Sequence, residues 1–168
     1  GGRFGWNIAD QRPDLVKAIV TSEPAAPPIR GVNTTEVAYR DTGGLPWGVS
    51  NLPISYEPGI SDPSEFNLEL QAQAEGPDLI PCYQQQEPAN QLVNLVDIPV
   101  LFLNGEGSYH RIYDHCLANW LNQAGVETDY MRLEEVGLEG NGHMMMLELN
   151  SSEIADFIGN WLERNTPE

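Results

Sequence analysis

The sequence predicts an α/β fold in which three mostly parallel strands carry flanking helices. Short apolar runs at positions 16–20 and 98–103 have the continuous hydrophobic character of strands buried on both faces, and the run at 128–133 alternates like a strand nearer a sheet edge. Helical patterns lie before, between and after these runs. Strands and helices that alternate in this order form parallel sheets with right-handed crossovers.

Three segments have the apolar spacing of amphipathic helices. Positions 4–11 form the first, which ends before Pro13 because a proline disfavours helical backbone at the preceding residue. The second runs from about 112 to 124, between the second and third strands. At the third helix, Asn150 and Glu153 predict a capping box. Its buried face is expected to carry Ile154, Phe157, Ile158, Trp161 and Leu162.

The stretch from 25 to 95 breaks the alternation of strands and helices. It holds nine of the 13 prolines and shows no long periodic segment. We expect a Pro-rich lid insertion beyond the carboxyl ends of the strands, where ligands bind in such sheets. The predicted organisation is therefore a start of the core at 1–24, a lid at 25–95 and a C-terminal core at 96–168. A disordered linker is the alternative, against which stand large apolar side chains such as Trp47, Tyr56 and Phe66.

Composition excludes several classes of partner. A formal net charge of -17, from 25 acidic and 8 basic side chains, argues against nucleic acid and against anionic membrane surfaces. No apolar run approaches the roughly 20 residues of a membrane span. Cys82 and Cys116 have neither CxxC nor zinc-site spacing, so no metal or cofactor is expected, while a single disulfide remains open.

Two short motifs have the residue types of a hydrolytic site. Gly140-Asn141-Gly142-His143 lies between the third strand and the last helix, where a glycine-flanked bend can hold an imidazole over the strand ends. At the other end, Gly1-Gly2 followed by a helix is typical of the turn that comes directly after a nucleophilic serine. These motifs predict an imidazole base and a nucleophile that stands just before Gly1.

Four segments in order resemble the C-terminal half of an α/β-hydrolase, and the resemblance covers the whole chain. They are Gly1-Gly2 with its helix and the ranges 16–24, 98–106 and 140–143. The family order is nucleophile, acid, histidine. The resemblance implies acyl transfer from a small carboxylic ester, with His143 as the base. It also implies that the serine and the oxyanion donors belong to an N-terminal half, the expected partner of this chain.

The resemblance leaves a choice of catalytic acid. Many members of the family have a Gly-x-x-Asp turn after the penultimate strand, but the matching turn here is Gly105-Glu106-Gly107-Ser108, with serine in the acid's place. Other members place the acid after the strand that follows the nucleophile helix, and Glu23 stands there, as in esterases with a Ser-Glu-His triad. We therefore expect Glu23 to orient His143. Glu106 and Asp114 are the fallback acids.

A polar cluster and the missing nucleophile are the last features of the sequence that bear on function. The polar cluster after the second strand is interpreted mainly as exposed helix surface, with the edge of a substrate pocket or the start of a helix as the alternative. Its members are Tyr109, His110, Tyr113, Asp114 and His115. Because the nucleophile is missing, the alternative function is a truncated, catalytically inactive remnant or a partner-binding fragment. The chain alone is not expected to hydrolyse esters. Composition and motifs identify neither the substrate nor the compartment.

Overall fold

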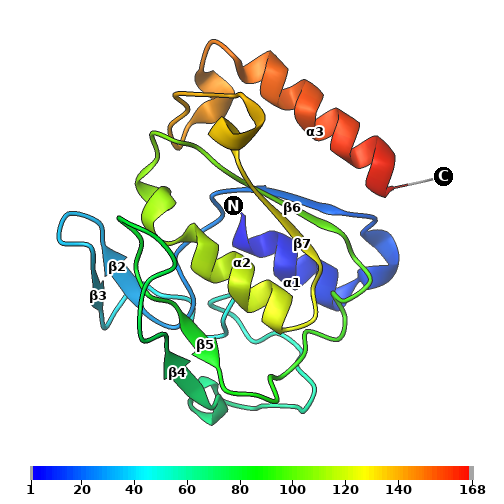
Figure 1. Ribbon diagram of the computed structural model, residues 1–168. Coiled ribbons are helices and arrows are strands. Elements are labelled where there is room, and N and C mark those ends of the chain that lie inside the picture. The colour runs from blue at the N-terminus through cyan, green and yellow to red at the C-terminus, as the bar shows by residue number, and fades with distance from the viewer. Residues whose placement is uncertain (1, 167–168) are drawn as a thin grey trace.

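A computed structural model describes residues 2–166 and shows a three-layer arrangement around a parallel sheet. The sheet consists of β1 (Ile19–Ser22), β6 (Val100–Asn104) and β7 (Thr128–Arg132), in the order β1-β6-β7 (Figure 1). Both strand pairs are parallel, with Ile19 opposite Val100 and Val100 opposite Thr128. The mixed α/β class and the parallel sheet are thus as predicted. The expected turn at Gly1 lies outside the described residues.

Helices cover both faces of this sheet. The helices α1 (Arg3–Gln11) and α2 (Asp114–Gln123) lie on one face, and α3 (Ser151–Asn165) lies on the other. β6 is buried at every position because alternate side chains enter two separate cores. Phe102 packs with α1 and α2, whereas Leu103 packs with α3. Among residues 2–166 no helix is both long and apolar enough to cross a membrane.

Two local expectations differ from the structure. The first strand begins at Ile19 and not at position 16, because its pairing partner β6 begins only after Pro99, whose carbonyl accepts the first hydrogen bond from Ile19 N. The expected capping box at α3 is also wrong. Asn150 makes no side-chain cap; its amide exchanges two hydrogen bonds with the amide of Asn141, at 2.6 and 3.0 Å. Short 3₁₀ helices join the main elements: η1 (Pro13–Leu15), η2 (Pro63–Glu65), η3 (Tyr109–Ile112), η4 (Leu133–Val136) and η5 (Met145–Leu147).

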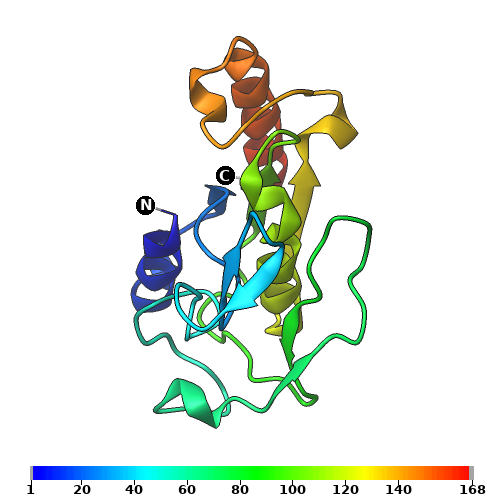
Figure 2. The ribbon, with the colours of Figure 1, turned by 90° about the vertical axis from the view of Figure 1, so that its left-hand side faces the viewer.

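The segment 25–95 is folded and forms two antiparallel hairpins. One pairs β2 (Gly31–Asn33) with β3 (Ala38–Arg40), and the other pairs β4 (Leu68–Leu70) with β5 (Tyr83–Gln85). Figures 1 and 2 show most of it on the side of α1 and α2, away from α3. It is therefore not the disordered linker considered as an alternative.

Aromatic side chains join this segment to the main core. Trp120 of α2 donates a hydrogen bond from Nε1 to the hydroxyl of Tyr56 at 3.0 Å, and that hydroxyl donates to the carbonyl of Trp47 at 3.0 Å. Phe66 meets both the Tyr56 and the Trp120 rings edge-on. The polar tips of Tyr56 and Trp120 thus both have a partner, which is the usual arrangement for such aromatic residues in a core.

A disulfide between Cys82 and Cys116 adds a covalent link between the segment 25–95 and α2. The sequence left this pairing open. Cys116 stands in the first turn of α2, two residues after Asp114, so the bridge fixes the start of that helix.

Replacement of both cysteines with alanine should lower the free energy of unfolding by about 2 to 4 kcal/mol, because the bridge joins residues 34 positions apart and restricts the unfolded chain. Urea denaturation without reductant measures the difference. Added reductant should destabilise the wild type and leave the double variant unchanged. Equal stability of the two proteins in the absence of reductant would contradict the prediction.

Candidate functional site

Glu23 stands at the carboxyl end of β1 with its side chain completely buried. Its backbone has a φ of +46°, a conformation that is unfavourable for a residue with a side chain and that tends to occur at functional sites. Gly105 N donates to Oε1 at 2.9 Å, and Ser108 Oγ donates to Oε2 at 2.6 Å. The carboxylate therefore has a fixed position at the ends of the first two strands.

The loop that carries His143 packs directly on the end of β6. A Cβ at Gly105 would overlap the carbonyl oxygen of Asn141, so only glycine permits this approach. Gly107 N donates to the same carbonyl at 2.8 Å. From the other side, the Glu148 carboxylate accepts from Gly142 N at 2.9 Å. These contacts hold the loop without any regular secondary structure.

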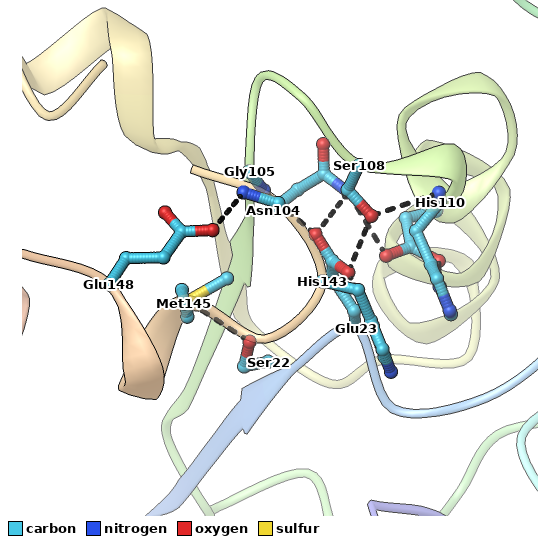
Figure 3. Close-up of polar contacts among 11 residues, drawn as sticks. Ser22, Glu23, Asn104, Gly105, Ser108, His110, His143, Met145 and Glu148 are labelled. Atoms are coloured by element: carbon cyan, nitrogen blue, oxygen red, sulfur yellow. Dashed lines mark hydrogen bonds and ion pairs between the residues drawn. The ribbon is translucent and has the colours of Figure 1, made fainter. Parts of the chain in front are cut away.

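The structure brings Glu23 and His143 together although they are 120 positions apart. Glu23 Oε2 lies 2.7 Å from His143 Nδ1 (Figure 3). Because the carboxylate accepts at Nδ1, the neutral ring carries its proton there and presents the lone pair of Nε2. The His143 side chain is 38% exposed while that of Glu23 is fully buried. The arrangement thus offers an accessible imidazole base with a buried acid that fixes its tautomer.

A cavity of about 590 Å³ opens beside His143 and is lined by residues from distant parts of the chain. Arg3 comes from the first turn of α1, Asn51 from the segment 25–95, and Tyr109 from η3. Gly2 packs so closely on Pro24 that a Cβ would overlap the proline ring. The start of α1 therefore lies next to Glu23, at the mouth of the cavity.

The two fallback acids have other partners. Glu106 accepts from the backbone nitrogen of Gly140 at 3.0 Å and so braces the histidine loop. Asp114 Oδ1 lies 2.9 Å from Nδ1 of His110, not of His143. The interpretation of the polar cluster as exposed helix surface is wrong, because His110, Asp114 and His115 are buried. Asp114 and His115 start α2, and Nε2 of His115 lies 3.1 Å from the carbonyl oxygen of Ile80 in the segment 25–95.

Asp114 and His110 form a second carboxylate–imidazole pair beside the first. The rings of His110 and His143 stack with an interplanar angle of 1° and centroids 4.8 Å apart. Burial raises the pKa of Asp114 to about 6, although the hydrogen bond with His110 opposes this shift. Sequence reasoning did not identify this pair; the i, i+4 spacing of histidine and aspartate was the available signal.

Among residues 2–166, two groups of side chains have atoms of metal-ligand type close together. In the first, Cys82 and Cys116 are joined in the disulfide, beside His115. In the second, made of Glu23, His110 and His143, the carboxylate and both Nδ1 atoms already take part in hydrogen bonds. The side chains of the first group therefore suit a disulfide, and those of the second group suit a hydrogen-bond network.

The chain is similar to a known protein in sequence and to a solved structure over part of its length. The chain is 41% identical over 165 residues to a probable secreted lipase, phiG, from Fungal sp. (strain ATCC 74256). The match covers 97% of this chain, which spans 43% of the length of that curated relative. A solved structure of a novel bacterial esterase is 35% identical with a TM-score of 0.39, over 44% of this chain and 25% of that one. No family model matches the chain.

Asp114→Asn should change how stability depends on pH. The raised pKa means that the native protein binds a proton more tightly than the unfolded chain between about pH 4 and pH 6, so the wild type loses stability as the pH rises through this range. An asparagine has no such titration. We expect the stability of the variant relative to the wild type to rise by up to about 3 kcal/mol from pH 4 to pH 7.

Urea denaturation at several pH values measures this difference. The exposed Asp97, replaced in the same way, serves as the control and should show no comparable trend. A difference between Asp114→Asn and the wild type that stays constant with pH would contradict the prediction.

Proposed function

We propose that this chain supplies the general base and its orienting acid to a hydrolase of carboxylic esters. The observation that carries the proposal is the 2.7 Å contact between buried Glu23 and accessible His143 at the edge of a cavity. The similarity to a probable secreted lipase over nearly the whole chain supports it independently. An imidazole with a fixed tautomer beside a substrate-sized cavity suits acyl transfer.

In the proposed reaction His143 Nε2 first removes the proton from a nucleophilic hydroxyl as this attacks the ester carbonyl. The resulting imidazolium is stabilised by Glu23 through the Nδ1–H hydrogen bond. His143 then returns the proton to the departing alcohol, which leaves an acyl-enzyme. A water molecule, activated by the same imidazole, releases the acid and restores the hydroxyl.

We place the nucleophile outside residues 2–166. Within that range no hydrogen bond joins His143 Nε2 to a hydroxyl or thiol, and Ser22 Oγ, which also lines the cavity, contacts the sulfur of Met145 at 3.2 Å. The first turn of α1 lies beside Glu23, which suits a nucleophile on a turn that leads into this helix.

The free edge of β1 is the proposed position of the strand that carries the nucleophile. In the described part of the chain β1 pairs only with β6. Next to it lies an apolar groove of about 230 Å³ between β1 and α3, lined by Val20, Met145 and Ile154 among others. An open apolar edge of this kind favours pairing with a further strand. We propose that a segment of the longer protein occupies it.

Glu23→Gln should reduce kcat for a short-chain p-nitrophenyl ester by about 10²- to 10⁴-fold in the protein at its natural length, because the amide no longer stabilises the imidazolium. Glu106→Gln is the matched control and should retain at least half of the activity, since Glu106 braces only the loop backbone. A Glu23→Gln variant with wild-type kcat would contradict the assignment of the acid.

A fluorophosphonate probe should label the naturally expressed protein on a single serine outside residues 2–166, because the probe reacts with hydroxyls that a neighbouring imidazole activates. Peptide mapping by mass spectrometry identifies the labelled residue. His143→Gln should abolish labelling. Modification of Ser22, or labelling that persists without His143, would refute the proposed position of the nucleophile.

A further inference from the structure

The stacked pair of imidazoles suggests a role for His110 and Asp114 beyond packing. Both histidines have a carboxylate on Nδ1, at 2.7 Å for His143 and 2.9 Å for His110. Their rings are parallel. Figure 3 shows that the Nε2 atoms of both rings, which lie opposite the Nδ1 atoms, point to the same side. Both residues line the same cavity. Burying a second imidazole and a second carboxylate here is costly unless they are paired, as these are.

Two side chains connect the second pair to the first. Asn104 Nδ2 lies 3.2 Å from Asp114 Oδ2 and 3.5 Å from Glu23 Oε1, so one amide faces both carboxylates. Ser108 Oγ donates to Glu23 and accepts from the backbone nitrogen of His110 at 3.1 Å. The two pairs are therefore linked through Asn104 and Ser108.

Two carboxylates contact the two rings. Glu23 comes from the end of β1 and Asp114 from the start of α2, and both are buried. Burial raises the pKa of the phenols of Tyr113 and Tyr130, which therefore stay uncharged at neutral pH. Other groups near the rings include Tyr109, which contacts both of them, Arg3 on the wall of the cavity, and Arg40, whose charge acts on Tyr113. Arg111, which follows His110 in η3, is paired with Glu134.

We propose that His110 and Asp114 are positioning residues for His143: the His110 ring fixes the plane of the neighbouring imidazole, and the charge of Asp114 stabilises the imidazolium of His143. Asp114 is ionised above about pH 6, where ester hydrolysis needs a neutral His143 at the start and an imidazolium at the transition state. The catalytic consequence rests on the proposed function, whereas the effect on His143 does not.

Titration of the His143 imidazole by NMR tests the electrostatic part without reference to activity. The spectrum is recorded on the protein at its natural length. The imidazole signal that disappears in the His143→Gln variant is assigned to His143. In Asp114→Asn the pKa of His143 should fall by a few tenths to about one unit, because a nearby negative charge is lost. The substitution needs no rearrangement of Asn104, since the new amide can keep its oxygen toward Asn104 Nδ2 and donate from its nitrogen to His110 Nδ1, with the proton of the His110 ring on Nε2.

His110→Phe is the second variant, because it keeps an aromatic ring in the stack but removes the partner of Asp114. The buried carboxyl then takes up a proton, and the pKa of His143 should fall as in Asp114→Asn. A rise in His110→Phe would mean that His110 itself carries a repelling charge, which would overturn the proposal. An unchanged pKa of His143 in Asp114→Asn would overturn it as well.

Kinetics separate this proposal from the proposed function. If the protein hydrolyses esters, the acid limb of kcat/KM should move to lower pH in Asp114→Asn, and kcat should fall about 3- to 10-fold with little change in KM. Asp97→Asn, at the other end of β6, is the matched control and should shift neither quantity. If no ester is hydrolysed, the proposed function fails, while the NMR titration still decides the role of Asp114.

Discussion

The buried carboxylate of Glu23 is the constraint on which the site depends. A carboxylate without contact to water is stable only if its oxygens have hydrogen-bond partners, and these come from Gly105, Ser108 and His143. Those partners belong to two loops that are far apart in the sequence. Satisfying one charged group therefore fixes the ends of β1 and β6 and the histidine loop relative to one another.

The packing of the core restricts the positions of the strand ends that carry the site. β6 is buried on both faces, so its carboxyl end has little freedom to move. The segment 25–95 adds aromatic packing against Trp120 and a disulfide to Cys116, both on α2. Since α2 begins at Asp114, these contacts also hold the second carboxylate beside the first. A segment that lacks long helices and strands thus contributes to the precision of the site.

Much of the core was predictable because its signals are local. Apolar runs and helical spacing identified the strands and helices to within a few residues, and the order of elements predicted the parallel sheet. The proximity of Glu23 and His143 followed from the resemblance to a family and not from spacing. The burial of His110 and Asp114 was missed because it depends on contacts with Asn104 at the end of β6 and with the ring of His143, which are tertiary and leave no local signal. The capping box predicted at Asn150 was wrong for a similar reason. The Asn150 side chain bonds to the side-chain amide of Asn141 and not to a backbone N–H in the first turn of α3.

The contact between Ser108 and Glu23 has a consequence for where a negative charge can stand in this site. The turn 105–108, from which the sequence resemblance would lead one to expect an acid, carries a serine at position 108, and its hydroxyl is 2.6 Å from the carboxylate of Glu23. The ends of β1 and β6 therefore both bring a side chain next to the imidazole of His143. A carboxylate carried by either strand end would therefore lie within reach of the same imidazole, with the histidine loop and the backbone unchanged.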